Sequence, residues 1–113
     1  MKRNVKLFIN DILDSIDKIE SFSKGLTKEG LSKDNLRQYA IVRAIEIIGE
    51  AVKSISDDLK KDYPGIPWKE IIGMRDVVIH SYFKLDLEKV WKTIKEDIPE
   101  LKQKILKIKE DLE

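Results

Sequence analysis

Residues 35–60 are apolar around most of the circumference that a helix over this stretch would have. The apolar positions are Tyr39, Ala40, Ile41, Val42, Ala44, Ile45, Ile47, Ile48, Ala51, Val52 and Ile55. A single polar stripe interrupts them at steps of three and four residues, formed by Arg43, Glu46, Glu50, Lys53 and Asp57. A helix that is apolar on nearly all sides must also be covered on nearly all sides.

The chain offers little material with which to cover such a helix. It has 113 residues, and a chain of this length builds only a small core. We therefore expect part of the helix over 35–60 to form a subunit interface. The alternative is that it is the central helix of a monomeric bundle.

Two further segments carry the spacing of amphipathic helices. Near the N-terminus an apolar stripe runs in steps of three and four through Val5, Phe8, Ile12, Ile16 and Ile19, with Ile9 and Leu13 beside it. The last segment has a seven-residue repeat suited to packing along another helix, through Leu87, Trp91, Ile94, Ile98, Leu101, Ile105, Ile108 and Leu112. Pro99 interrupts this repeat, so we expect two helices or a kink near Asp97.

The segments between these helices contain recognisable starts and turns. Residues 23–34 are polar and are expected to form a loop, with Ser32 as the N-cap of the next helix. Residues 63–68 indicate a turn, with Pro67 at the first position of a short helix that ends near Ile79. Asp86 stands at the N-cap position of the last segment.

No segment shows the alternation of a strand, so the sequence predicts one all-α domain over residues 1–113 with four or five helices. The composition limits its chemistry. Cysteine is absent, which excludes disulfides and thiolate metal sites and favours a cytoplasmic protein. No targeting or membrane-spanning segment is visible. The net charge is only +1, from 22 Lys and Arg against 21 Asp and Glu, so bulk charge gives no support for nucleic-acid binding.

The chemistry most specific to this chain surrounds its one histidine, His80. Arg75 precedes it by five residues, and the helical neighbours of Arg75 at three and four residues are all apolar: Ile71, Ile72, Val78 and Ile79. A guanidinium in such surroundings is poorly screened and favours an anion. Asp76 lies four residues before His80, within reach to orient the imidazole.

Five residues correspond to about 140° around a regular helix and about 7.5 Å along it, so Arg75 and His80 do not share a face automatically. They converge only if the helix ends or deforms near His80, or if Arg75 reaches across. If they do converge, the imidazole can move a proton and the guanidinium can stabilise charge on a phosphorane. Because one histidine cannot be acid and base at once, a symmetric dimer that joins two such pairs in one cleft would supply both.

Less specific interpretations compete with these. A lone arginine and histidine near a helix end are most often surface or capping residues. Glu46 and Glu50 could hold a metal, but an ion-pair network with Arg43 and Lys53 explains them better. Two aromatic side chains, those of Trp68 and Trp91, lie in apolar patterns and are expected in the core.

The segment Arg75-x-x-x-x-His80-x-Tyr82 resembles the signature of the HEPN superfamily, and specifically of the HepT-like toxin family. Three other stretches resemble that family in the same order, so that the resemblance covers essentially the whole chain. They are residues 43–51, residues 63–68, and residues 90–94 with 97–99.

The resemblance implies an up-and-down helical-bundle homodimer whose motifs face each other. It implies a metal-independent endoribonuclease, without a cofactor, that acts on tRNA or mRNA as the toxin of a type VII-like toxin–antitoxin pair. Arg75 and His80 become the catalytic pair, and Asp76 fills the position where the superfamily usually has a polar residue. The usual partner is a minimal nucleotidyltransferase antitoxin of the MntA type, which transfers AMP to the motif tyrosine, here Tyr82. Without the resemblance, Tyr82 reads as an ordinary aromatic residue at the core edge.

The low net charge fits RNA capture poorly, so lysines near the cleft would have to bind the RNA, with Lys69 and Lys84 as candidates. The alternative function is a non-catalytic HEPN module that serves a partner nucleotidyltransferase as its substrate-binding subunit or its protein target.

Overall fold

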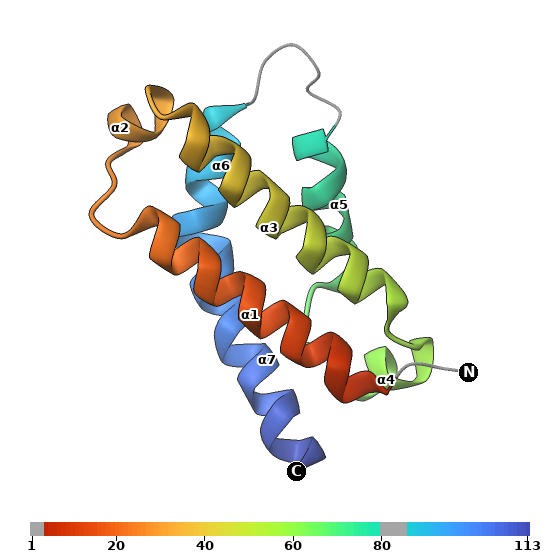
Figure 1. Cartoon of the computed structure of the whole chain (residues 1–113). Coiled ribbons are helices and arrows are strands. Elements are labelled where there is room, and N and C mark those ends of the chain that lie inside the picture. Colours follow the sequence, from red (N-terminus) through yellow and green to blue (C-terminus); the bar gives the residue numbers. More distant parts are fainter. Residues whose placement is uncertain (1–3, 80–85) are drawn as a thin grey trace.

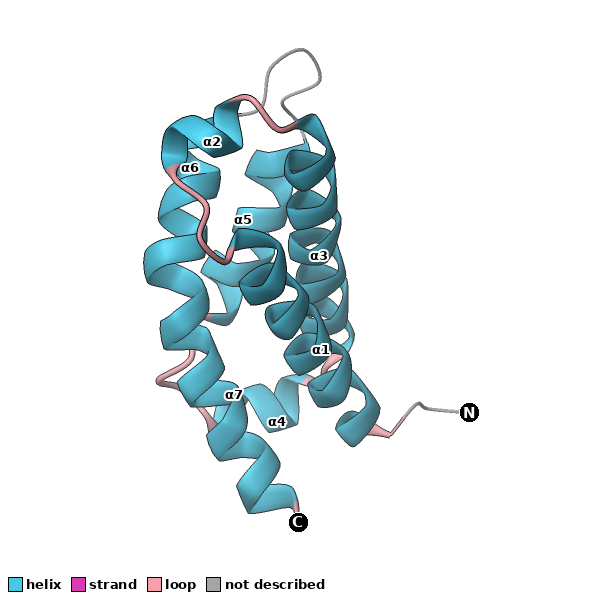
Figure 2. Ribbon diagram, turned by 60° about the vertical axis from the view of Figure 1, so that its left-hand side comes forward, coloured by secondary structure: helices cyan, strands magenta, loops and turns pink. Residues whose placement is uncertain are grey.

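Four long helical segments run alternately up and down through the molecule (Figures 1 and 2). The structure is a computed structural model that describes residues 4–79 and 86–113, with residues 75–79 described by their backbone alone. The long segments are α1 (Val5–Ser23), α3 (Asn35–Ser54), α5 (Trp68–Ile79) and the continuous run of α6 (Leu87–Lys92), η1 (Thr93–Asp97) and α7 (Ile98–Leu112). Two short helices, α2 (Lys28–Ser32) and α4 (Asp57–Asp62), lie in the connections, and these described ranges contain no strand. The all-α prediction is confirmed.

Isoleucine fills the centre of the bundle. The predicted apolar stripes face inward, because α3 packs against both α1 and α5, and α1 also packs against α7. The side chains that are fully buried or nearly so include Ile9, Ile12, Ile16, Ile19, Ile41, Ile45, Ile48, Ile98, Ile105 and Ile108. Both tryptophans are half-buried against this core rather than enclosed in it.

The kink expected near Asp97 takes the form of a π-helical turn. Pro99 has no backbone N–H to donate to the carbonyl four residues before it. In the preceding turn the N–H of Ile98 donates to the carbonyl of Thr93, five residues back, and this widens the helix. The seven-residue repeat continues through the turn, with Ile94 and Leu101 buried on either side of the proline.

Some helix boundaries differ from those predicted. The segment 23–34 is not all loop, because α2 forms within it on an N-cap by Thr27, whose hydroxyl accepts from the N–H of Gly30 at 2.9 Å. Ser32 closes α2, and the N-cap of α3 is Asp34. The helix expected over 35–60 ends at Ser54, and Ser56 caps the separate helix α4.

The other helix starts and stops agree closely with the sequence. The helix α5 spans Trp68–Ile79, and the carbonyl of Pro67 accepts from the N–H of Ile71, so the proline precedes the first helical residue by one position. Asp86 is the N-cap of α6, as predicted, with its carboxylate accepting from the N–H of Lys89 at 3.2 Å.

Replacing Ile45 by alanine is expected to destabilise the chain by roughly 2–5 kcal/mol, because it leaves a cavity at the centre of α3 where this side chain is 0% exposed. The matched control is Leu106→Ala on α7, where the leucine is 44% exposed and the loss is expected to be much smaller. Urea denaturation followed by circular dichroism measures both. Equal losses in the two variants would contradict this core assignment.

Candidate functional site

The third long helix, α5, carries part of the predicted motif to one end of the bundle. We call this the upper end: α1 ends there at Ser23, α3 begins at Asn35, the described part of α5 extends through Ile79 and α6 begins at Leu87 (Figure 1). The backbone of Arg75 lies in the last turns of α5 before that end. The convergence of the Arg75 and His80 side chains stays a prediction.

Several predicted site residues cannot be placed against one another. His80, Tyr82 and Lys84 lie outside the described residues, and Arg75 and Asp76 are described by their backbone alone.

Lys69 is exposed in the first turn of α5. It lies six residues before Arg75, which is roughly 9 Å along the axis and about 240° around it, so the two do not share a helix face. A role for Lys69 in RNA binding stays a prediction.

The corner between α1 and α3 is fixed by polar contacts at the upper end. The Arg37 Nε donates to the Phe22 carbonyl at 3.0 Å, and its Nη1 donates to the Asp34 carboxylate at 2.5 Å. The same carboxylate accepts from the backbone N–H of Arg37 at 3.0 Å, and Gln38 Nε2 donates to the Leu31 carbonyl at 2.7 Å. These contacts tie the end of α1 and the short α2 to the first turn of α3.

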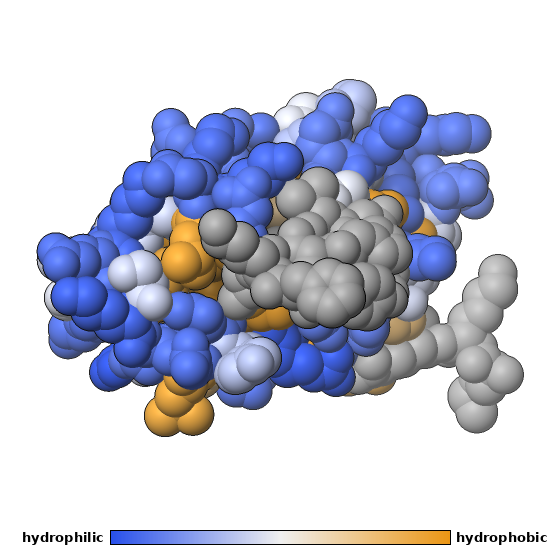
Figure 3. Space-filling view, turned by 90° about the horizontal axis from the view of Figure 1, so that it is seen from above, coloured by the Kyte–Doolittle hydropathy of each residue, from blue (hydrophilic) through white to orange (hydrophobic). Residues whose placement is uncertain are grey.

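Two large apolar side chains stand out from this fixed corner. Leu36 is 79% exposed and Tyr39 is 73% exposed, while Val42 and Ile47 further along α3 are partly exposed. Figure 3 looks down on the upper end and shows apolar surface breaking through a mostly hydrophilic surround. In this single chain α3 is thus a central helix, and the first half of its outer face still carries uncovered apolar groups.

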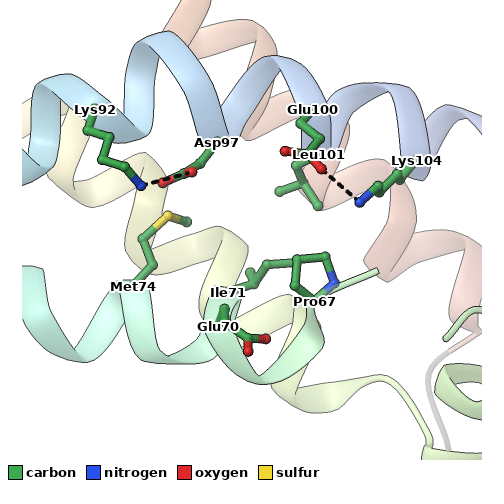
Figure 4. Close-up of a pocket in the computed structure, with 9 residues that line it drawn as sticks. All are labelled: Pro67, Glu70, Ile71, Met74, Lys92, Asp97, Glu100, Leu101 and Lys104. Atoms are coloured by element: carbon green, nitrogen blue, oxygen red, sulfur yellow. Dashed lines mark hydrogen bonds and ion pairs between the residues drawn. The ribbon is translucent and has the colours of Figure 1, made fainter. Parts of the chain in front are cut away.

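A groove separates α5 from the last helical run (Figure 4). It has a volume of about 310 Å³. Its floor is apolar, formed by Pro67, Ile71, Met74 and Leu101. Two ion pairs stand on the rim formed by α6, η1 and α7: Lys92 with Asp97 at 3.7 Å and Lys104 with Glu100 at 3.0 Å. The groove reaches Met74, the residue directly before Arg75.

A second hollow, of about 460 Å³, lies on the outer face of α6 and η1, and we call it the Trp91 hollow. It is lined by Glu88, Lys89, Trp91, Lys92, Lys95 and Glu96. The Lys95 ammonium lies over the indole ring, 4.8 Å from its centroid. The sequence argument missed this site, although lysines at steps of three residues, 89, 92 and 95, were a visible signal.

The polar stripe of α3 gives an ion pair rather than a metal site. Arg43 Nη1 lies 3.2 Å from the Glu46 carboxylate, which confirms one pair of the expected network. Among residues 4–74 and 86–113, whose side chains the structure describes, no group of three or more acidic side chains is arranged to hold a metal ion. Within the same ranges, no helix has the length and apolar character needed to cross a membrane.

The chain is an up-and-down helical bundle, and α5 carries the backbone of Arg75, the first residue of the sequence pattern Arg75-x-x-x-x-His80, toward the upper end. These features define a class of small all-helical proteins that contain an Arg/His motif. Within that class, residues 12–108 match the family described as ribonuclease HepT-like. The chain belongs to this family.

Curated relatives extend the match over the whole chain. The "Probable ribonuclease HepT" of Thermococcus cleftensis is 47% identical over 109 residues, which are 96% of this chain and 99% of the relative. A "Putative RNase" of Methanocaldococcus jannaschii is 46% identical over 112 residues, 99% of this chain and 93% of that protein. A longer protein of the same organism, named as a gamma-glutamylcyclotransferase and "putative RNase", is 44% identical over 113 residues, and this chain spans only 51% of it. No solved structure matches the chain.

Replacing Asp34 by asparagine is expected to change how stability depends on pH. The N–H and the guanidinium of Arg37 stabilise the ionised carboxylate and lower the pKa of Asp34 below its ordinary value of 3.8. A lowered folded-state pKa contributes stability that is complete above pH 3.8 and is lost as the pH falls through the lower folded-state pKa. Asparagine can still cap the helix but carries no charge.

Urea denaturation of both proteins between neutral pH and pH 3 measures the effect. We expect the wild type to be more stable near neutral pH and its advantage to shrink in acid. An advantage that stayed constant or grew in acid would contradict the ion-pair role of Asp34.

Proposed function

We propose that this chain is a metal-independent endoribonuclease that cleaves RNA at a cleft between two copies. The observation that carries the proposal is the position of Arg75 near the upper end of α5, five residues before the only histidine, in a chain of the ribonuclease HepT-like family. The names of relatives that this chain matches almost end to end support the same substrate class.

The residues supply a complete cleavage step without a metal. The His80 imidazole of one copy removes the proton from a ribose 2′-OH, and that oxygen attacks the adjacent phosphorus. The partner's His80 donates a proton to the departing 5′-oxygen, so a cyclic 2′,3′-phosphate and a free 5′-OH remain. Arg75 stabilises the charge that gathers on the phosphorane, and Asp76 orients the imidazole.

The exposed apolar side chains of α3 support a second copy at this end. Leu36 and Tyr39 lie at the upper end, where α5 and α6 also have their ends, so a two-fold contact through them brings the two motifs toward each other. Leu36 and Tyr39 stand three residues apart and so are neighbours on one face of α3, and contiguous exposed apolar surface is what marks a contact site.

The biological role that fits this chemistry is a toxin held in check by a partner. A minimal nucleotidyltransferase of the MntA type would transfer AMP to Tyr82, two residues after His80. The added phosphate would compete for Arg75, and the added bulk would keep RNA out of the cleft. The RNA would be a tRNA or an mRNA. The second candidate function, a non-catalytic partner of such a transferase, is favoured by the net charge of +1.

Purified protein is expected to cleave total RNA in the presence of EDTA. His80→Ala should lose about 10²–10⁴-fold in rate because it removes the proton-transfer group. Arg75→Lys should lose about 10²–10³-fold because an ammonium cannot replace the guanidinium fork at the phosphorane. Gel analysis of RNA fragments over time measures the rates.

The controls separate the two candidate functions. Intact-mass measurement first establishes that the preparation carries no AMP. If unmodified protein cleaves nothing, the non-catalytic interpretation holds. Cleavage that persists unchanged in His80→Ala would point to a contaminant or to another site.

The dimer is tested at α3. We expect the wild type to have twice the 13.2 kDa mass of one chain in sedimentation equilibrium. The variant Leu36→Lys/Tyr39→Lys should have the single-chain mass, keep its helical circular dichroism and lose cleavage, because both changes lie on the surface. The control Leu7→Lys/Leu106→Lys alters leucines that are 45% and 44% exposed elsewhere and should stay dimeric. A dimer that survives the α3 changes would refute this interface.

A further inference from the structure

We infer that the Trp91 hollow is a binding subsite for single-stranded RNA, in which a base stacks on the indole and Lys89 and Lys95 bind the flanking phosphates. This inference rests on the proposed function, because it assigns the path of the RNA substrate outside the cleft. The hollow is shallow and open to solvent, with a volume of about 460 Å³.

The charges around the indole favour an anionic ligand. The Glu88 carboxylate is paired with Lys28 of α2, which reduces the negative field at this edge of the hollow. Lys92 makes only a long contact of 3.7 Å with Asp97, and both side chains are well exposed. In the described part of the chain, Lys89 and Lys95 have no carboxylate partner. Glu96 is the one acidic group of the hollow that remains to oppose them.

The Trp91 indole favours an anion that carries an aromatic base beside its phosphate. Trp91 is half-buried, so its position is held by the core while part of the indole faces the hollow. The Lys95 ammonium rests over the ring, at 4.8 Å from the centroid, and a stacking base would have to displace it. A base that stacks there makes a stronger contact than the exposed lysine does. The displaced Lys95 ammonium then reaches the phosphate beside the stacked base.

The Trp91 hollow adjoins the groove between α5 and the last helical run. Lys92 lines both the Trp91 hollow and the groove that reaches Met74, the residue before Arg75. A strand bound at Trp91 can therefore continue past Lys92 into this groove, which reaches Met74 of α5. Single-stranded RNA fits this surface better than a duplex, whose bases are paired and cannot stack on a side chain.

The experiment measures the affinity of a short single-stranded oligonucleotide with 2′-O-methyl groups, which cannot be cleaved by 2′-OH attack. Fluorescence anisotropy gives the dissociation constant over a series of salt concentrations. Trp91→Leu keeps an apolar side chain against the core and should weaken binding about 10-fold through lost stacking. Binding should also quench tryptophan fluorescence in the wild type but not in Trp91→Leu, where Trp68 is the only remaining indole.

The charge test uses matched double variants. Lys89→Gln/Lys95→Gln should weaken binding and lower the slope of log affinity against log salt by about 1.4, for two phosphate contacts at about 0.7 each. Lys107→Gln/Lys109→Gln removes the same charge near the C-terminal end of α7 and should leave affinity and slope close to the wild type. A duplex of the same sequence should bind more weakly and should not depend on Trp91.

Each other outcome overturns the inference. No binding by the wild type, or equal binding by all variants, excludes the subsite. Equal losses in the two lysine pairs indicate a diffuse charge effect, and Trp91-dependent binding of the duplex excludes base stacking. The RNA cleavage assay with His80→Ala decides the proposed function separately, so a cleaving enzyme with no role for Trp91 would refute only this inference. If Trp91→Leu loses its helical circular dichroism, the two lysine pairs, which are surface changes, decide the matter.

Discussion

The packing of α3 against α1 and α5 fixes the position of the remaining elements. Buried isoleucines along α3 hold both neighbours, and α1 in turn holds α7. The packing between α5 and the last helical run is different. Among the described residues these two segments make no comparably extensive contact, and the groove lies between them. The helix that carries Arg75 is therefore positioned mainly from one side. Any change that shifts α3 also shifts the end of α5, while the groove side leaves room for a ligand or a partner.

The local arrangement of the charged side chains, rather than the net charge of the chain, is what could attract RNA. Nearly equal numbers of acidic and basic residues give no long-range attraction for RNA. Many of the charges form exposed pairs within or between helices, such as Lys102 with Glu20 and Lys104 with Glu100, and these pairs cancel at a distance. What remains for an anion are the cations without a carboxylate beside them, which in the described part of the chain are about half of all the lysines and arginines. Two of these, Lys89 and Lys95, stand around Trp91, and the inferred RNA subsite depends on them.

Most of the fold followed from periodicity, since a stripe at steps of three and four residues determines which face of a helix is buried. Local competition between possible caps was harder to predict. Ser32 and Asp34 are both good N-caps, and the choice depended on Arg37, whose guanidinium also reaches the Phe22 carbonyl and so favours Asp34. The end of α3 at Ser54 was equally hard to predict from the sequence, because Ile55 continues the apolar pattern. In the structure the chain turns at Ile55, and Ser56 caps a new helix.

The candidate site was predictable as a motif but not as a surface. Arg75 and His80 stand out in the sequence by residue type alone. The exposure of Leu36 and of part of Trp91, in contrast, depends on which helix faces the neighbouring helices leave uncovered. Apolar residues in a short chain are expected to be covered, and sequence does not say which remain outside. Only the three-dimensional arrangement separates the apolar groups of α3 that α1 and α5 cover from those they leave exposed.

Folding and activity thus make different demands on the same helix. The buried isoleucine core is formed by residues of a single chain. On the proposed mechanism the chemistry needs two chains, because one copy supplies one histidine and cleavage needs both an acid and a base. The helix α3 serves both the core and the proposed dimer contact. Its inner face completes the core, and its outer face presents Leu36 and Tyr39. On the proposed mechanism, the fraction of active enzyme follows the concentration of paired chains rather than that of folded ones. The strength of the α3 contact then sets the amount of protein at which cleavage begins.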